Sequence, residues 1–328
     1  MIIDVHAHLS PPESARRYPM PPSLTDVDAM LDARSEAGID LTVIGSPVGA
    51  GAMMRVPGVD NYRQPADRLR ALHDWTAALV ARFPERLRAY AYVNPLGSEA
   101  ELRAADETAR DPAFVGFVVN SSVRGRFLDD PAADGFFALA AERRLPVFVH
   151  PPAEPAGARE VADLRFVEQV SRFADVASGL AMIAFAGWPD RYPDLTLIGA
   201  TGGGGVAALT DKLDLAARPR PFGPPPASVD AAGAPPRPAV SASPGAAVRR
   251  MYVDTAAPSD ALTAMNLAVF GAGHMLLGTD SPPVPVPPAR AVARIRDLPI
   301  GPAEQAAILG GNAASLFGLA PVRTGGRA

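Results

Sequence analysis

The chain has 328 residues, a net charge of −4 and a hydrophobic share of 48%, and it contains no cysteine. The lack of cysteine excludes disulfide bonds, thiolate metal ligands and cysteine nucleophiles, and the weak negative charge argues against a nucleic-acid or anionic-membrane partner. No apolar run of about 18 residues is present and the N-terminus lacks the basic and apolar regions of a signal peptide, so we expect a cytoplasmic protein without a membrane span.

Eight short β-branched and apolar runs alternate with longer helical patterns. The predicted strands are Ile2–His6, Leu41–Gly45, Leu87–Val93, Val115–Asn120, Pro146–His150, Leu195–Ala200, Arg250–Asp254 and Met275–Thr279. The helical patterns include Asp26–Ala37, Ala66–Phe83, Ala132–Glu142, Glu160–Phe185 and Ser259–Gly271. Strands that alternate with helices form parallel βαβ units, and eight units predict a closed (β/α)8 TIM barrel. No Gly-x-Gly-x-x-Gly pattern follows the first strand, which counts against a dinucleotide-binding sheet.

One segment, at about residues 218–244, is crowded with Pro, Ala, Gly and Ser and shows no helical or strand period. It follows the sixth predicted strand, where barrels often carry long loops over the active site. Two interpretations stand: a surface insertion, or an active-site lid or oligomer contact. The sequence therefore predicts one barrel domain over residues 1–319 that contains this insertion, followed by a disordered tail over residues 320–328.

The first predicted strand ends with two histidines at alternate positions, His6 and His8. Because strand side chains alternate between faces, both should point the same way, together with Asp4, whereas Ile3, Val5 and Ala7 should face the helices. Two imidazoles on one face can bind one divalent ion. A His-x-His pair also arises by chance, so its place on the first strand is what gives it weight.

Two further potential ligands lie at the ends of other strands. His150 ends the fifth strand and Asp280 follows the eighth. Taken singly, His150 could be a packed rim histidine, and Asp280 a helix cap or turn residue. In a closed barrel, however, the carboxyl ends of the strands meet at one rim, and strands one and eight are neighbours. We therefore expect His6, His8, His150 and Asp280 to converge on one ion.

Seven short segments give the chain a recognisable pattern. They are Ile3–His8, Gly125–Pro131, Leu145–Pro151, Arg191–Leu195, Tyr252–Thr255, Gly278–Pro282 and Gly311–Ala314. In this order they resemble the amidohydrolase superfamily, specifically the amidohydrolase-related group typified by aminocarboxymuconate semialdehyde decarboxylase. The resemblance implies a (β/α)8 barrel of the metal-dependent hydrolase type that binds one divalent ion, usually zinc. It matches His6, His8, His150 and Asp280 to the metal ligands of the group.

One position departs from that pattern. Relatives usually carry a histidine used in proton transfer after the sixth strand, whereas this chain has Thr201 followed by glycines. A hydroxyl is no base near pH 7, but it can hydrogen-bond a substrate oxygen. Asp280 could serve both as a ligand and as the group that takes a proton. Asp254, at the end of the seventh strand, is a second candidate acid or base, with a structural role as the alternative.

Substrate recognition is predicted from polar residues that follow the strands. Asn120 ends the fourth strand and could face the pocket. Arg55 follows the second strand, and Arg124 and Arg126 follow the fourth. An arginine can bind a carboxylate through two parallel hydrogen bonds, although most arginines on loops are simply solvated.

These features favour a metal-dependent lyase that decarboxylates a small unsaturated or aromatic carboxylate without an oxidant. One alternative is a hydrolase of an amide, ester or lactone, or the reverse cyclodehydration in secondary metabolism. A non-catalytic relative that binds a ligand is the other alternative. The expected partner is a small-molecule substrate, and the resemblance also suggests a homodimer.

Overall fold

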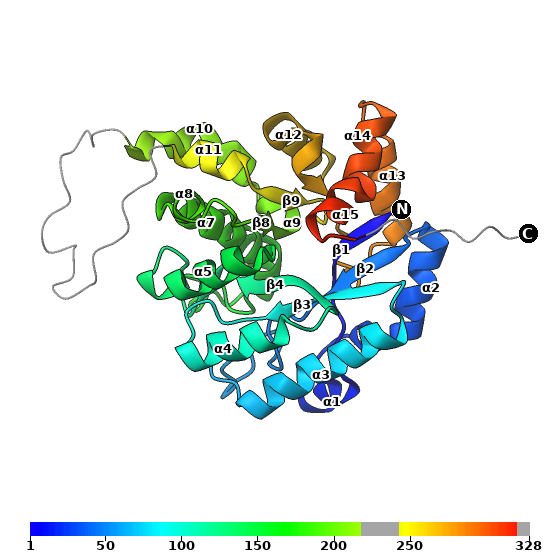
Figure 1. The fold of residues 1–328 in the computed structure, drawn as a ribbon, viewed down its shortest axis with the longest axis vertical. Coiled ribbons are helices and arrows are strands. Elements are labelled where there is room, and N and C mark those ends of the chain that lie inside the picture. The colour runs from blue at the N-terminus through cyan, green and yellow to red at the C-terminus, as the bar shows by residue number, and fades with distance from the viewer. Residues whose placement is uncertain (218–242, 320–328) are drawn as a thin grey trace, which may run out of the picture.

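The structure, a computed structural model, describes residues 1–217 and 243–319 (Figure 1). Residues 218–242 of the predicted insertion and the whole predicted tail, residues 320–328, lie outside the described part. Pro244, the last residue of the predicted insertion, begins a helix. This start agrees with the preference of proline for the first turn of a helix.

Eight parallel strands form one sheet in the order β1-β2-β3-β4-β7-β8-β9-β10. They are β1 (Ile3–Ala7), β2 (Leu41–Ile44), β3 (Leu87–Tyr92), β4 (Phe114–Asn120), β7 (Val147–His150), β8 (Leu197–Gly199), β9 (Tyr252–Asp254) and β10 (Met275–Leu276). Beyond β10 the chain bonds to β1, from the amide of Val5 to the carbonyl of Leu277 at 2.9 Å and from the amide of Asp280 to the carbonyl of His6 at 2.7 Å. These bonds close the ring, and the predicted (β/α)8 barrel is confirmed.

Helices cover the outside of the barrel (Figure 1). They are α1 (Pro12–Arg17), α2 (Val27–Ala37), α3 (Ala66–Arg82), α4 (Glu99–Thr108), α5 (Asp134–Arg143), α6 (Leu164–Phe166), α7 (Arg172–Phe185), α8 (Trp188–Arg191), α9 (Ala200–Gly203), α10 (Thr210–Leu213), α11 (Pro244–Arg249), α12 (Asp260–Phe270), α13 (Pro288–Arg296), α14 (Pro302–Ala306) and α15 (Asn312–Leu316). Short 3-10 turns lie at Pro22–Leu24, Pro131–Ala133, Val206–Leu209, Asp214–Ala217 and Ala272–His274, and π-helical turns at Val167–Ser171 and Ala307–Gly311. None of the described helices is long and apolar enough to cross a membrane.

Helix α2 shows how the sequence sets these elements. The side chain of Asp26 accepts a hydrogen bond from the amide of Ala29 and so caps the first turn, while Gly38 ends the helix in the left-handed conformation at φ 71°. Both devices satisfy backbone groups that a helix end leaves without partners. Between them, Met30 and Arg34 are buried against the barrel. Arg34 thereby reaches the strands beneath the candidate site.

The first strand corrects the predicted face assignment. Ile3 and Val5 belong to a buried cluster with residues of the other strands and of α15, inside the barrel, whereas Asp4 pairs with Arg34 of α2. The pairing of β1 with β2 shifts its register between Asp4 and Ala7. Such a bulge resets the alternation of side chains, so Asp4 faces the helix layer although His6 and His8 meet at the rim.

A buried histidine in the helix layer predicts acid sensitivity. His73 of α3 accepts a hydrogen bond from the amide of Tyr92 at 3.1 Å, and burial lowers its pKa to about 4. The histidine of the unfolded chain titrates near about 6.5. The contribution of the neutral, buried ring to the free energy of unfolding is therefore complete above that pH and is lost as the pH falls toward 4. We expect a loss of about 3 kcal/mol over this range.

Equilibrium unfolding in urea at several pH values measures this loss. His73→Gln should flatten the pH dependence of the unfolding free energy between pH 6.5 and 4 relative to wild type, because glutamine does not titrate. Parallel curves for the two proteins would show that His73 does not contribute in this way.

Candidate metal centre

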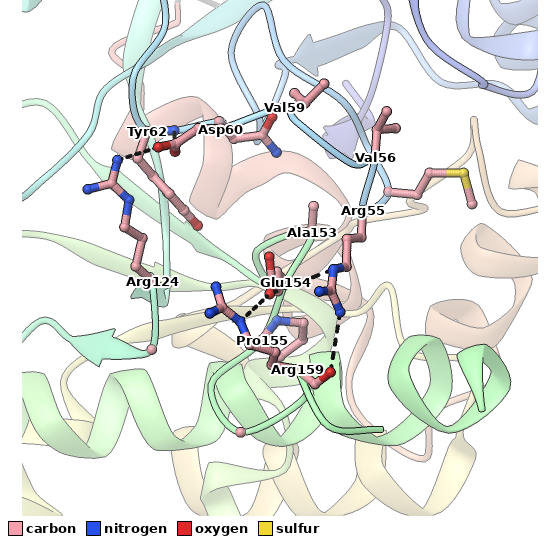
Figure 2. A pocket seen from close by; sticks show the side chains of 14 residues that line it. Arg55, Val56, Val59, Asp60, Tyr62, Arg124, Ala153, Glu154, Pro155 and Arg159 are labelled. Carbon is pink, nitrogen blue, oxygen red and sulfur yellow. Dashed lines mark hydrogen bonds and ion pairs between the residues drawn. The ribbon is translucent and has the colours of Figure 1, made fainter. Parts of the chain in front are cut away.

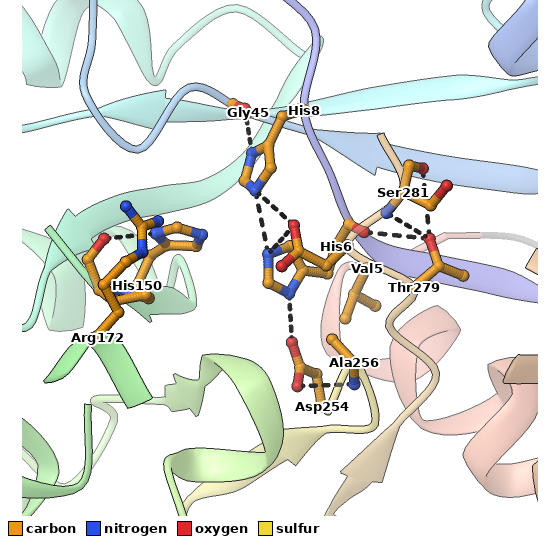
Figure 3. Close-up of polar contacts among 12 residues, drawn as sticks. Val5, His6, His8, Gly45, His150, Arg172, Asp254, Ala256, Thr279 and Ser281 are labelled. Atoms are coloured by element: carbon orange, nitrogen blue, oxygen red, sulfur yellow. Dashed lines mark hydrogen bonds and ion pairs between the residues drawn. The ribbon is translucent and has the colours of Figure 1, made fainter. Parts of the chain in front are cut away.

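Three histidines converge at the carboxyl ends of β1 and β7 (Figure 3). The ligand nitrogens of His6, His8 and His150 lie within 4.8 Å of one another, and all three residues are buried. Nε2 of His6 is 3.1 Å from Nε2 of His8. Oδ1 of Asp280 is 3.4 Å from the first of these nitrogens and 3.2 Å from the second. The four residues that the sequence predicted to converge are therefore neighbours.

Backbone carbonyls fix the tautomers of two of these histidines. Nδ1 of His8 lies 2.9 Å from the carbonyl oxygen of Gly45, and Nδ1 of His150 lies 2.8 Å from that of Pro151. A carbonyl oxygen can only accept a hydrogen bond, so each Nδ1 must carry the proton. Each neutral ring then presents an unprotonated Nε2 to the cluster.

A buried carboxylate holds the third histidine in the same way. Oδ2 of Asp254 is 2.6 Å from Nδ1 of His6, and both side chains are fully buried. The other oxygen, Oδ1, accepts hydrogen bonds from the amides of Gly202 at 2.8 Å and Ala256 at 3.1 Å. Asp254 thus lies behind His6 with its oxygens already engaged, and the structure places it to orient the imidazole.

The Nε2 atoms of the histidines and the Asp280 carboxylate therefore face one another at short distances, and a positive charge among them would stabilise this arrangement. Burial opposes a positive charge on His6, but the carboxylates of Asp280 and Asp254 raise its pKa to about 9. Burial and the neighbouring rings of His8 and His6 lower the pKa of His150 well below the usual range. A proton shared at His6 can satisfy the cluster, and so can a divalent ion. Three imidazole nitrogens and a carboxylate oxygen are a ligand set that fits such an ion.

A buried ion pair fixes the turn that carries Asp280. Asp280 has a left-handed backbone with φ 52°, a costly conformation for a residue with a side chain. On one flank, the amide and hydroxyl of Thr279 donate to Asp4 at 3.0 and 2.7 Å. Arg34 pairs with Asp4 at 2.8 Å and also donates to the carbonyl of Ser281 on the other flank. The Asp4–Arg34 pair thus holds both neighbours of Asp280.

The cluster lines a cavity of about 930 Å³. Its polar lining includes His8, His150, Glu168, Arg172, Thr201 and Asp280. Its apolar lining includes Met20, Met53, Met54, Phe173, Leu262 and Val284. The polar groups include the candidate ligands, so a ligand in this cavity would meet both the cluster and an apolar wall.

The chain matches a protein-family model over almost its whole length. The family model described as Amidohydrolase matches residues 3–319. The chain belongs to the amidohydrolase family. The match spans almost all of the described residues, and it agrees with the resemblance inferred from the sequence.

Individual relatives of this amidohydrolase are distant. It is 22% identical over 302 residues to 2-amino-3-carboxymuconate-6-semialdehyde decarboxylase of Dictyostelium discoideum, which covers 90% of this chain and 77% of the relative. Among solved structures, 5-carboxyvanillate decarboxylase of Sphingomonas paucimobilis is 20% identical, with a TM-score of 0.78 over 98% of this chain and 99% of the other. Dihydroxybenzoic acid decarboxylase of Polaromonas sp. JS666, with bound manganese and 2-nitroresorcinol, is 20% identical, with a TM-score of 0.72 over 97% of each chain. These structures support the barrel fold.

Thr201 lies in the wall of the amidohydrolase cavity. It precedes Gly202, whose amide donates a hydrogen bond to Asp254. Its backbone is left-handed at φ 50°. Its Oγ1 atom is buried and has no hydrogen-bond partner among the described residues. A buried hydroxyl without a partner is costly unless something else bonds to it. Its position therefore suits a hydrogen bond to a bound ligand.

Asn120 ends β4 but lines neither of the two described cavities. Its Nδ2 donates to the carbonyl oxygen of Pro47 at 2.8 Å, and Pro47 lines the larger cavity. Its contact with the site is therefore indirect, through the loop after β2.

The three predicted substrate arginines do not line the cavity that holds the histidine cluster. Arg55 and Arg124 line a second cavity of about 500 Å³ near the surface (Figure 2). There Arg124 pairs with Asp60 at 2.5 Å. Arg126 is exposed and pairs with Asp130. We therefore do not assign these arginines to the substrate of the histidine cavity.

A small hairpin explains part of this outcome. After β4 the chain forms an antiparallel pair, β5 (Ser122–Val123) and β6 (Arg126–Phe127), which the sequence did not predict. Arg124 and Gly125 form its turn, both with positive φ. The hairpin directs its arginines to the acidic side chains of the surface, where their positive charges are already paired.

Among the described residues, the arginine that lines the cavity is Arg172, the first residue of α7. Figure 3 shows it beside His150. It lies inside the predicted helix Glu160–Phe185, whose pattern gives no sign of which turn faces the cavity. Sequence reasoning therefore missed it.

The contact between Asp254 and His6 gives a testable role. Asp254 accepts N–H donors at both oxygens, so Asp254→Asn must turn an amide NH2 toward one of them. We expect metal affinity to fall about 10- to 100-fold, as when other carboxylates behind metal-ligating histidines are changed. Competition with a chelating dye measures the affinity. Asp260→Asn, at an exposed carboxylate of α12, is the control, and equal affinity in both variants would refute the role.

Proposed function

We propose that this amidohydrolase is a carboxy-lyase that depends on one divalent ion and removes CO2 from a small aromatic or unsaturated carboxylate. His6, His8, His150 and Asp280 would hold the ion, and zinc is the ion we propose because imidazoles and a carboxylate suit it. The convergence of these ligand atoms on the wall of a 930 Å³ cavity carries the proposal. The relatives named as decarboxylases support the same reaction class.

When bound, the ion would supply positive charge beside the substrate. In the reaction, the bond to the carboxyl carbon breaks, CO2 leaves, and the electron pair that stays on the substrate carbon takes up one proton. We assign Asp280 to carry this proton because it lies beside the histidines and lines the cavity. Burial opposes its ionisation, but His6 and His8 lower its pKa, so it must first take a proton from substrate or solvent.

The reaction is tested with the metal-loaded protein and a panel of aromatic and unsaturated carboxylates that includes 2,6-dihydroxybenzoate. We expect CO2 and the decarboxylated product in equal amounts from at least one member, and loss of both after chelation. Asp280→Asn should abolish turnover while the protein stays folded. Cleavage of esters or lactones without CO2 from any carboxylate would favour the hydrolase alternative and contradict the proposal.

The hydroxyl of Thr201 gives a finer prediction. Thr201→Val keeps the branched shape, and so the backbone strain, but removes the hydrogen-bonding group. If Oγ1 bonds to the substrate, kcat/KM should fall about three- to tenfold, as for one neutral hydrogen bond, with unchanged metal content. Steady-state kinetics with a substrate from the panel measures the change. An unchanged kcat/KM would mean that the hydroxyl does not touch the substrate.

A further inference from the structure

Arg172 differs from other largely buried arginines of the described chain. Its side chain is 17% exposed, and its one described partner is the carboxylate of Glu168 at 3.7 Å, beyond hydrogen-bond distance. Arg294, at 16% exposure, donates to Asp260 and to the carbonyl of Ala257, and Arg34 bonds to four neighbours. A guanidinium has five N–H donors that must be satisfied when it is buried. Arg172 therefore lacks an acceptor within the described structure.

The local backbone presents this side chain to the cavity. A π-helical turn at Val167–Ser171 immediately precedes Arg172, and such turns often mark functional sites. Glu168, Arg172 and Phe173 all line the cavity. Glu168 is itself about half exposed, at 48%, so it neutralises the guanidinium only in part. The cavity thus has a positive group beside the histidine cluster and separate from it.

The departing carboxylate is not the best partner for this charge. As CO2 forms, that group loses its negative charge, so an arginine bound to it would stabilise the reactant more than the transition state. An anionic group that the product retains keeps its charge throughout the reaction, so an arginine bound to it does not favour the reactant over the transition state. The cavity, at 930 Å³, lies near the upper end of the range of about 300–1,000 Å³ for small-molecule sites, and methionines, Phe173 and Leu262 supply apolar walls.

We propose that Arg172 is the specificity-determining residue of the cavity and binds an anionic oxygen group that the substrate keeps in the product. The substrate is accordingly an acid with a second anionic group and an apolar body larger than one aromatic ring. The guanidinium would bind a carboxylate through two parallel hydrogen bonds. This inference rests on the proposed function, because the bound acid is a substrate only if the proposed reaction takes place. Binding of the acid at Arg172 does not itself require turnover.

Binding of 2-naphthoate and 2-naphthamide to the metal-loaded protein, measured by calorimetry, tests the inference. These probes share their shape and differ in charge. We expect wild type to prefer the carboxylate at least about tenfold. Arg172→Met should reduce the preference severalfold, to what the ion alone supplies, while the amide still binds, which shows an intact cavity. Arg172→Lys should restore part of the loss. Arg165→Met, at an exposed arginine of α6, should behave as wild type.

Three outcomes would overturn the inference. They are no preference in wild type, a preference as large in Arg172→Met as in wild type, and tighter binding of benzoate than of 2-naphthoate. Glu168→Gln supplies an independent check, because removal of its competing charge should strengthen 2-naphthoate binding severalfold. Failure of the proposed function is distinguishable: the charge preference would then persist in wild type although no carboxylate releases CO2.

Discussion

His150→Ala should purify without its divalent ion and with activity at least about a thousandfold below wild type. The variant removes one of three imidazole ligands, and the ion's contribution of several kcal/mol to the transition state is lost with it. Elemental analysis after dialysis and the rate of CO2 release measure the two effects. The fold should survive, because His150 lies at the rim, where burial already keeps its ring neutral.

A second histidine provides the control for this variant. His274 precedes β10 at the opposite end of the barrel and belongs to no ligand cluster of the described residues. His274→Ala should therefore keep both metal and activity. A full complement of metal in His150→Ala would refute the assignment of this side chain as a ligand.

Arg34→Met should destabilise the protein by about 3–5 kcal/mol, the usual cost of leaving a buried charge without its partner. Arg34 is 1% exposed and Asp4 is fully buried, and their contact is 2.8 Å. The variant also frees the turn around Asp280, so metal affinity should fall as well. Urea unfolding of the metal-free protein separates the first effect from the second, because bound metal adds its own stabilisation.

The double variant Asp4→Asn with Arg34→Met isolates the pair. Asparagine keeps an acceptor for the amides that bond to Asp4 but carries no charge, so the double variant should be more stable than Arg34→Met alone. A cost below about 1 kcal/mol for Arg34→Met would mean that the pair contributes little and that other contacts hold the turn.

The fold could be predicted from the sequence because the patterns that indicate its strands are local. Apolar runs such as the one that ends at His150 need only their own residues to indicate a strand, and eight of them imply the barrel and the rim at which ligands meet. The face predicted for Asp4 was wrong because the bulge in β1 depends on the pairing of β1 with β2, which the local sequence does not record.

The candidate site was only partly readable for a related reason. Ligands at strand ends follow from topology, so His6, His8, His150 and Asp280 could be found together. The contact of Asp254 with His6 depends on two strands that are not adjacent in the sheet. Arg172 depends on how one helical turn packs over the rim, and the side chain of Arg124 on a hairpin turn, so neither position carries a sequence signal.

The most direct test of the central claim is an anomalous diffraction map of crystals grown with Zn²⁺ or Mn²⁺. The account predicts one peak per chain, in contact with Nε2 of His6, His8 and His150 and with the carboxylate of Asp280, at about 2.0–2.2 Å. A map without a peak between these four side chains, or with the rings turned so that Nε2 faces away from the ion, would contradict it.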